Sequence, residues 1–270
     1  MDILKNIIAQ KNIEVEERKS LYPIKLLERS TYFESPTVSL KKYLLREDKL
    51  GIIAEFKRKS PSKGIINKYA DVERTSIGYM MAGASALSIL TDNDFFGGKN
   101  EDLTIARKFN YCPILRKDFI VDEYQIIEAK AIGADVILLL ANVLNPLQIK
   151  QYAQFAKSLG LEVLLEVREK EELNALNIYI DAVGVNNRNL NNFEVNVSQS
   201  FELADLISSD FIKISESGIN DVKIIQDLKN IGYKGFLIGE LFMKNSKPEI
   251  ACAKFIKDLI ALTNTPTKKK

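Results

Sequence analysis

The sequence predicts an α/β protein, a closed (β/α)₈ TIM barrel with an N-terminal helical extension. Short apolar, β-branched runs alternate with longer segments whose apolar residues recur at helical spacing, as in a parallel sheet covered by helices. Eight such runs occur, and their carboxyl ends lie roughly 26 residues apart, the length of one strand–helix unit. Eight units favour closure into a barrel over a doubly wound open sheet, which usually has fewer strands.

The eight expected strands are short segments that end close to a polar or glycine residue. They cover residues 51–57, 86–90, 113–117, 135–140, 162–167, 181–186, 211–216 and 235–239. The loop after the first strand reads KRKSPSKG. It lacks the glycine spacing of a dinucleotide-binding loop and therefore counts against the open-sheet alternative.

Capping residues mark the expected helices between these strands. Four apolar helical stripes are each preceded by a residue whose side chain can accept a hydrogen bond from the first turn of the helix. These residues are Asp71, Asp122, Asn145 and Asn220. Glycines that favour a helix end follow three of the stripes, at Gly133, Gly160 and Gly232.

Residues 1–48 precede the first strand and read as helical. One apolar stripe runs through Ile3, Leu4, Ile7 and Ile8, and a shorter one through Leu26 and Leu27; the pattern breaks at Ser35-Pro36 and resumes toward Leu45. Because all eight strands lie beyond this extension, we expect it to serve substrate binding more than folding of the barrel. We expect the polar tail at 265–270 to fray, and residues 1–270 to form one domain.

The charge balance excludes several classes of function. The 270-residue chain has 38 Lys and Arg against 36 Asp and Glu, a net charge of +2, which gives no support for a nucleic-acid or membrane partner. It contains no His, so a Ser-His-Asp triad and a His-ligated metal are impossible. Cys112 and Cys252 form no zinc pattern. The N-terminus has no apolar signal region and the longest apolar run, 136–141, is short, which predicts a cytoplasmic protein.

Charged residues stand at the carboxyl ends of the expected strands, where barrel enzymes have their active sites. Glu55 and Lys57 are two residues apart and so share one side of the first strand. Any one charge at a strand end is commonly just an exposed loop residue, but ammonium and carboxylate groups at five of eight ends favour an active site. The other ends carry Lys117, Asp118, Glu166, Asn186, Asn187, Arg188, Glu216, Ser217, Gly218, Gly239 and Glu240.

A phosphate site is expected where the last two strands meet the first. Gly218 and Gly239 stand at strand-to-loop turns, where backbone amides can converge on an oxyanion. They could instead only supply the backbone conformation of a turn. With Ser60, Lys63 and Gly64 in the adjacent loop after the first strand, a phosphate clamp is the better interpretation.

Several of these segments together resemble the indole-3-glycerol phosphate synthase family. The matching motifs are IIAEFKRKSPSKG, LTDNDFFGG, PILRKDFIVDEYQIIEAKAIGADVILLL, LLEV, VGVNNRNL, ISESGI and FLIGELFM. They follow the order and spacing of the family, span about residues 50–245, and are accompanied by a helical N-terminal extension as in that family.

The resemblance implies a carboxy-lyase of tryptophan biosynthesis. The reaction is ring closure of 1-(2-carboxyphenylamino)-1-deoxyribulose 5-phosphate with loss of carbon dioxide and water, giving indole-3-glycerol phosphate. By this resemblance Lys117 is the proton donor, and Glu166 and Lys57 assist the dehydration. Glu55 would orient both ammonium groups, and Asn186 would bind substrate hydroxyls.

The resemblance also implies the substrate contacts. Ser60, Gly218, Gly239 and the amide of Glu240 would bind the phosphate, although a small residue is common where Glu240 stands. Phe96 would pack on the anthranilate ring. Arg188, Glu216, Ser217 and Leu237 complete the expected substrate pocket. We expect no metal or organic cofactor, and the resemblance leaves open an association with other tryptophan-pathway enzymes.

Two alternatives remain at this stage. One is another sugar-phosphate barrel enzyme, such as phosphoribosylanthranilate isomerase, which would be expected to use a Cys or Asp pair rather than lysines at the strand ends. The other is a non-catalytic phosphate-binding barrel. The presence of Lys57, Lys117 and Glu166 argues against a site that has lost its chemistry.

Overall fold

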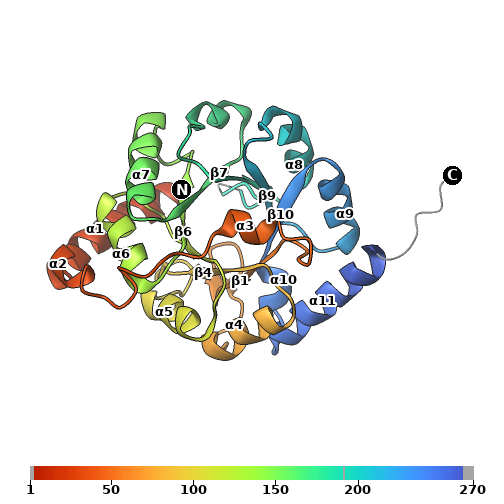
Figure 1. Ribbon diagram of the computed structural model, residues 1–270, viewed down its shortest axis with the longest axis horizontal. Helices are drawn as coiled ribbons and strands as arrows, with labels where there is room; N and C mark the ends of the chain where they lie inside the picture. Colours follow the sequence, from red (N-terminus) through yellow and green to blue (C-terminus); the bar gives the residue numbers. More distant parts are fainter. Residues whose placement is uncertain (1–2, 191, 264–270) are drawn as a thin grey trace.

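The computed structural model describes residues 3–190 and 192–263, and its centre is a closed barrel of eight parallel strands (Figure 1). The order around the barrel is β1-β10-β9-β8-β7-β6-β5-β4, and β1 pairs with β4 to close it. The strands are β1 (Ile52–Phe56), β4 (Ala86–Leu90), β5 (Ile114–Lys117), β6 (Val136–Leu140), β7 (Glu162–Val167), β8 (Ala182–Asn186), β9 (Ile212–Glu216) and β10 (Tyr233–Ile238). All eight predicted strands and the TIM-barrel class are therefore confirmed.

Helices surround the barrel and cover its outer face. They are α1 (Ile3–Leu21), α2 (Ile24–Leu27), α3 (Leu40–Leu44), α4 (Val72–Met81), α5 (Asn100–Phe109), α6 (Glu123–Ile132), α7 (Pro146–Ser158), α8 (Ser198–Leu203), α9 (Val222–Asn230), α10 (Glu240–Met243) and α11 (Pro248–Thr263). Two 3₁₀ helices, Lys170–Ala175 and Ala204–Leu206, and a hairpin of β2 (Lys59–Ser60) and β3 (Gly64–Ile65) complete the fold. No helix in the described ranges is long and apolar enough to cross a membrane.

Three of the four predicted helix starts are confirmed. The side chains of Asp71, Asp122 and Asn145 accept backbone N–H groups of α4, α6 and α7. The prediction of Asn220 was wrong by one residue, because the side chain of Asp221 accepts the N–H of Lys223 at the start of α9. The predicted polar tail at 265–270 lies outside the described residues.

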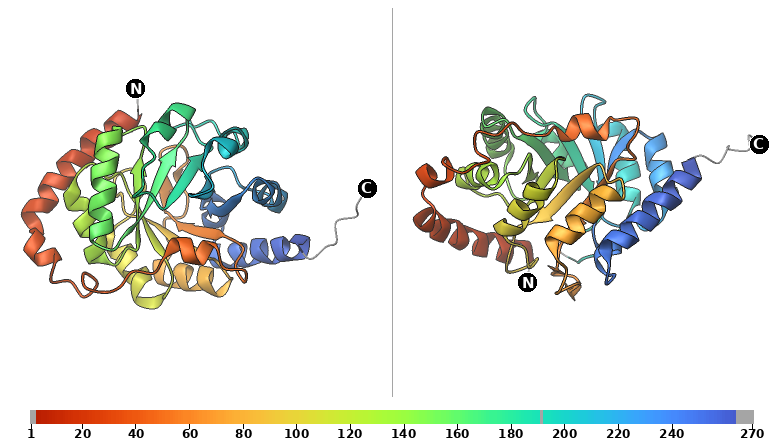
Figure 2. Two further views of the ribbon diagram at one scale, coloured as in Figure 1. Left: turned by 45° about the horizontal axis from the view of Figure 1, so that its top comes forward. Right: turned by 60° about the horizontal axis from the view of Figure 1, so that its bottom comes forward.

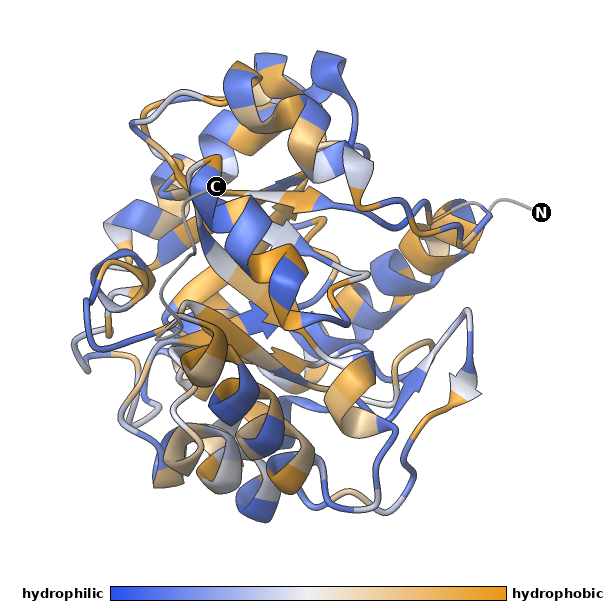
Figure 3. Cartoon of the chain, turned by 90° about the vertical axis from the view of Figure 1, so that its right-hand side faces the viewer, coloured by the Kyte–Doolittle hydropathy of each residue, from blue (hydrophilic) through white to orange (hydrophobic). Residues whose placement is uncertain are grey.

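Alternation along each strand separates two hydrophobic layers. Leu138, Leu164 and Ile214 belong to a cluster inside the barrel, whereas Ile137, Leu165 and Val183 belong to the layer between strands and helices. Figure 3 shows the hydrophobic strands at the centre, and helices that carry both hydrophobic and hydrophilic residues. Because side chains alternate between the two faces of a strand, every second residue points into the barrel.

The helix α3 closes the amino-terminal end of the barrel and lies across its centre in Figure 1. Leu40 and Leu44 are 2% and 4% exposed and join the inner cluster with residues at the starts of the strands. The preceding chain is fixed by Asp135, whose carboxylate accepts the N–H groups of Val38 and Ile114, each at 2.7 Å. The extension is thus part of the barrel core.

The helix α1 lies along the outside of the helix layer beside α6 (Figure 2). Val15 of α1 and Leu27 of α2 bury their side chains against Tyr124 and Ile127 of α6. The leucines of α3 pack into the inner cluster of the barrel, and Leu27 of α2 packs on α6, so these parts of the extension also contribute to the folded core. The first turns of α1 reach the pocket described below, and the role of the extension in substrate binding stays a prediction.

The position of Leu44 makes a test of this packing possible. Replacing a buried leucine by alanine removes apolar contacts and leaves a cavity, so Leu44→Ala should lower the free energy of unfolding by about 2–5 kcal/mol. Its neighbour Leu45 is 50% exposed, and Leu45→Ala should change stability by less than about 0.5 kcal/mol. Denaturant unfolding of the full chain measures both; equal effects of the two variants would contradict the packing of α3 into the inner cluster of the barrel.

Candidate active site

A pocket with a volume of about 280 Å³ opens at the carboxyl ends of the strands. Its wall contains the catalytic and substrate-binding residues that the family resemblance implies, although they come from six barrel strands and from loops that follow the strands. They are Glu55, Lys57, Ser60, Phe96, Lys117, Glu166, Asn186, Arg188, Glu216, Ser217, Gly218, Leu237, Gly239 and Glu240. The structure therefore brings these residues together.

The alternation of the strands explains why the charged residues meet. Glu55, Lys117 and Glu166 stand at inward-facing positions near the ends of β1, β5 and β7, in the same phase as the inner hydrophobic cluster. In these three strands the inner position becomes charged only near the carboxyl end. The barrel interior is consequently mostly apolar below and charged at its mouth.

Lys117 lies at the centre of the charged layer. Its Nζ is 2.9 Å from Oε2 of Glu166 and also contacts Oε2 of Glu216. Burial lowers the pKa of Lys117, but the two carboxylates raise it more, so its pKa lies well above the ordinary value. The ends of β7 and β9, which are not neighbours of β5 in the barrel, place their carboxylates on its ammonium group across the mouth.

Glu216 is the most deeply buried member of this layer, with an exposure of 1%. Burial raises its pKa to about 7, against the lowering effect of Lys117. Its Oε1 has no hydrogen-bond partner in the described part of the chain. Gly184 leaves room for this oxygen, since a Cβ at that position would lie 2.1 Å from it. The sequence analysis placed Glu216 in the substrate pocket but did not predict its contact with Lys117.

A second ion pair stands beside the first. Lys57 Nζ is 2.6 Å from Oε1 of Glu55. Glu55 thus contacts Lys57, whereas the carboxylates that pair with Lys117 in the described residues are those of Glu166 and Glu216; the expected role of Glu55 in orienting both ammonium groups stays a prediction. Asn186 donates a hydrogen bond of 2.9 Å to Oε1 of Glu166, the carboxylate that faces Lys117. These contacts fix the carboxylate of Glu166 between an amide and an ammonium group.

Backbone turns line the opposite end of the pocket from α1. Ser217 and Gly218 both have positive φ angles, 67° and 76°, and the serine conformation is costly for a residue with a side chain. Asn187, whose position was not assigned a role from the sequence, supports this turn by donating a hydrogen bond of 3.0 Å to the carbonyl of Ser217. Backbone N–H groups in such a turn are suited to an anion.

The predicted phosphate clamp is only partly assembled. Ser60 lies in the pocket wall, but Lys63 and Gly64 are exposed members of the β2–β3 hairpin and are not among the lining residues. Lys63 Nζ is 3.8 Å from Oε1 of Glu240, and Arg188 donates a hydrogen bond of 3.2 Å to Oε2 of the same side chain. The carboxylate of Glu240 thus faces two cations rather than pointing away.

An apolar wall, which sequence reasoning found only in part, lies near α1. Phe96 was predicted, and its ring lies 5.9 Å from the ring of Phe119. Ile3 and Ile7 of α1 and Leu140 of β6 complete the wall. The stripe on α1 was visible in the sequence and the extension was expected to serve substrate binding, but Ile3 and Ile7 were not named as residues of the pocket.

The residues suited to metal binding do not gather. Within residues 3–190 and 192–263, no three His, Cys, Asp or Glu side chains form a group that could hold a metal ion. The described pocket offers acid–base groups of lysine and glutamate, next to an apolar wall and an anion-suited turn.

A parallel barrel with ammonium–carboxylate pairs at its carboxyl-terminal mouth defines a TIM-barrel enzyme with its active site in this pocket. The family model for indole-3-glycerol phosphate synthase matches residues 4–258. The chain belongs to this family, whose members are decarboxylating lyases of tryptophan biosynthesis, and the family predicted from the sequence is confirmed.

Curated relatives agree over nearly the whole length. The chain is 47% identical over 256 residues to indole-3-glycerol phosphate synthase of Bacteroides thetaiotaomicron, covering 95% of this chain and 98% of the relative. It is 38% identical to the enzyme of the same name from Carboxydothermus hydrogenoformans, covering 91% and 96%.

Solved structures with much lower identity share the fold. A chain from the tryptophan synthase α₂β₂ complex of Pyrococcus furiosus has a TM-score of 0.58 at 15% identity, covering 79% of this chain and 99% of that chain. A structure described as native KDPGal has a TM-score of 0.56 at 12% identity, covering 81% and 96%. At these identities the likeness shows the TIM-barrel fold alone.

The space that Gly184 leaves for Glu216 can be tested by filling it. Gly184→Ala should displace the Glu216 carboxylate from Lys117 and lower kcat by about 10- to 100-fold, because a misplacement of about 1 Å is that costly at a reacting centre. The measurement is steady-state kinetics together with a thermal melt.

Gly235→Ala is the matched control, because a Cβ there also crowds a neighbour at 2.7 Å, but that neighbour is the apolar side chain of Ile214 and not a carboxylate of the site. This control should lose stability while keeping kcat. Equal kcat in the two variants would contradict the account of Gly184.

Proposed function

We propose that this pocket closes the indole ring of 1-(2-carboxyphenylamino)-1-deoxyribulose 5-phosphate, releasing carbon dioxide and water. The observation that carries the proposal is the contact of one ammonium group, Lys117, with the carboxylates of Glu166 and Glu216. This cluster stands between an apolar wall and an anion-suited turn. The substrate has the matching order of groups: an aromatic ring, a carbonyl carbon and a phosphate.

Lys117 is the proton donor of the ring-closing step in this proposal. The ring carbon that bears the carboxylate attacks the ribulose carbonyl carbon, and the new carbon–carbon bond pushes an electron pair onto the carbonyl oxygen. That oxygen takes a proton from the Lys117 ammonium. The carboxylate then leaves as carbon dioxide, and its bonding electrons return to the ring. Glu166 and Glu216 keep Lys117 protonated for this step.

The dehydration requires one proton on the departing hydroxyl and removal of one from the adjacent carbon. Lys57, held by Glu55 at 2.6 Å, is the acid, and Glu166 accepts the carbon-bound proton. Asn186 restrains Glu166 through the hydrogen bond of 2.9 Å and can contact substrate hydroxyls from the same position. Loss of water forms the carbon–carbon double bond of the indole ring.

The two ends of the substrate occupy the two ends of the pocket. The anthranilate ring packs on Phe96 beside Phe119. The phosphate lies at the turn of Ser217 and Gly218, close to Ser60 and Gly239. Arg188 supports binding by holding Glu240, whose backbone amide rather than its carboxylate is turned to the phosphate in this proposal.

The family match leaves no observation in favour of phosphoribosylanthranilate isomerase or of a non-catalytic barrel. A cytoplasmic location and an association with other enzymes of tryptophan biosynthesis stay predictions from the sequence. A phosphorylated small-molecule substrate is common to the whole family.

Substitution of Lys117 tests the proposal. Lys117→Ala should lower kcat by at least about two orders of magnitude, since a positioned general acid contributes about 10²- to 10⁴-fold. Lys117→Arg should not restore the rate, because a guanidinium group scarcely releases its proton. Indole fluorescence reports turnover, and a thermal melt reports folding.

Inhibition by inorganic phosphate should persist in both variants, because the phosphate turn is formed by other residues. A folded Lys117→Ala protein that retains a tenth or more of the wild-type kcat would transfer the role of proton donor to Lys57.

A further inference from the structure

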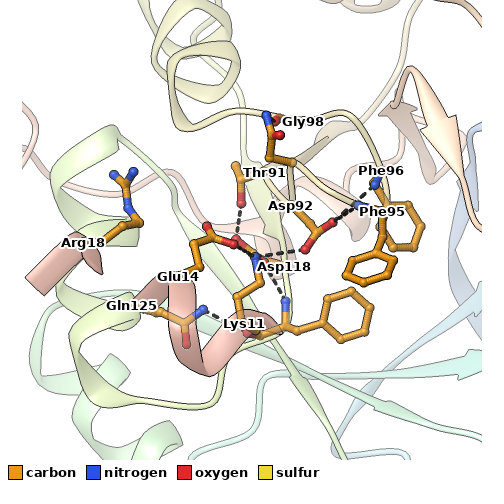
Figure 4. Close-up of polar contacts among 12 residues, drawn as sticks. Lys11, Glu14, Arg18, Thr91, Asp92, Phe95, Phe96, Gly98, Asp118 and Gln125 are labelled. Atoms are coloured by element: carbon orange, nitrogen blue, oxygen red, sulfur yellow. Dashed lines mark hydrogen bonds and ion pairs between the residues drawn. The ribbon is translucent and has the colours of Figure 1, made fainter. Parts of the chain in front are cut away.

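Lys11 of α1 is a lysine with only 1% exposure whose ammonium group lies among three carboxylates (Figure 4). Its Nζ is 2.7 Å from Oε2 of Glu14, 3.0 Å from Oδ2 of Asp92 and 3.0 Å from Oδ1 of Asp118. Asp92 follows β4 and Asp118 follows β5, so one ammonium group joins the helix α1 to two neighbouring active-site loops. The reaction proposed above makes no use of Lys11.

Each of the two aspartates also holds the backbone of an aromatic residue in the pocket wall. Oδ1 of Asp92 accepts the N–H groups of Phe95 and Phe96 at 2.9 and 3.2 Å. Oδ1 of Asp118 accepts the N–H of Phe119 at 2.8 Å. The rings of Phe96 and Phe119 lie 5.9 Å apart. Lys11 is therefore linked through one carboxylate to each half of the aromatic wall.

The two aspartates of this cluster differ in the cations with which they pair. Asp118 has a second cation, Arg116, at 3.1 Å and a hydroxyl donor, Thr91, at 2.6 Å. Although burial raises the pKa of Asp118, Lys11 and Arg116 lower it to about 2. In the described ranges, Lys11 is the cation that pairs with Asp92, which is 1% exposed. Without Lys11, Asp92 would hold an uncompensated buried charge, which is strongly unfavourable.

We propose that Lys11 is a positioning residue that fixes the separation of the loops after β4 and β5 and so shapes the subsite for the aromatic carboxylate of the substrate. The inference rests on the proposed function, because it assigns the ring of that substrate to this wall. Docking of α1 is then a condition for binding the aromatic end of the substrate. It is not a condition for binding the phosphate end, whose turn follows β9.

Lys117 is separate from this effect. It points into the barrel, where Glu166 and Glu216 hold it, whereas its neighbours Arg116 and Asp118 pair with each other, and Asp118 pairs with Lys11. Loss of Lys11 should therefore act on KM more than on kcat, and the pH dependence of kcat should keep its shape. A general loss of structure would instead lower kcat and phosphate binding as well.

The test is Lys11→Met, which keeps an unbranched side chain of similar length and removes the charge. Two probes separate the ends of the pocket: 2-aminobenzoate for the aromatic wall and inorganic phosphate for the turn. We expect about tenfold weaker binding of 2-aminobenzoate and a KM raised by a similar factor. Phosphate binding should stay within about twofold of wild type.

Two further variants decide the cause. Lys11→Met combined with Asp92→Asn removes the cation together with its carboxylate, while the asparagine oxygen can still accept the Phe95 and Phe96 N–H groups; it should regain most of the affinity for 2-aminobenzoate. Lys19→Met is the matched control on α1, because it removes an ion pair of 2.8 Å to Asp122 at the start of α6, away from the wall. It should bind both probes like wild type.

The outcomes separate this inference from the proposed function. Wild-type protein that does not turn the substrate over would overturn the proposed function. Wild-type turnover together with unchanged 2-aminobenzoate affinity in Lys11→Met would overturn the role of Lys11 alone. Equal loss of both probes in Lys11→Met would also overturn it. If Lys11→Met does not fold, the variant that combines Lys11→Met with Asp92→Asn gives the answer. If this double variant folds and still binds 2-aminobenzoate about tenfold more weakly than wild type, the unpaired charge of Asp92 is not the cause of the loss.

Discussion

One ammonium group shared by two carboxylates at the mouth of the barrel is the constraint on which the rest of the site depends. Removing three charged groups from water is unfavourable unless each is paired and held in place. Lys117, Glu166 and Glu216 meet this condition because three inward-facing strand ends bring them together. Gly184 leaves space for Glu216, and Asn186 fixes Glu166. The apolar barrel interior beneath them keeps water away from the lower side.

Alternation of side chains along β5 gives the adjacent residues Arg116 and Lys117 different functions. Lys117 points into the pocket, while Arg116 and Asp118 point outward into a buried network that reaches α1 through Lys11 and α6 through Glu128. The strand end is thereby held from both sides. The N-terminal extension has two tasks in this arrangement: α3 fills the lower opening of the barrel, and α1 supports the loops around the upper one.

The sequence was sufficient for the fold, because period-two alternation and capping residues are local signals, and with the family resemblance it was sufficient for most of the charged residues of the pocket. Glu55 and Lys57, two apart on one strand, could be placed on the same side, and their contact at 2.6 Å agrees. The pairing of Lys117 with Glu216 could not be predicted, since 99 residues separate them and only barrel closure sets the distance. The burial of Lys11 was equally hidden, because a lysine on a surface helix is usually solvated.

The titration of Glu216 tests most directly whether Lys117 and its carboxylates act as one unit. ¹³C NMR of proteins labelled at glutamate carboxyl carbons, with Glu216→Gln to identify the signal, follows this group against pH. We expect a pKa near 7 for Glu216 in the wild type, with the carboxylate ionised above that pH. We expect a still higher pKa in Lys117→Met, because the neighbouring positive charge is gone. A pKa near the ordinary value of 4.5 that does not change in Lys117→Met would contradict the account.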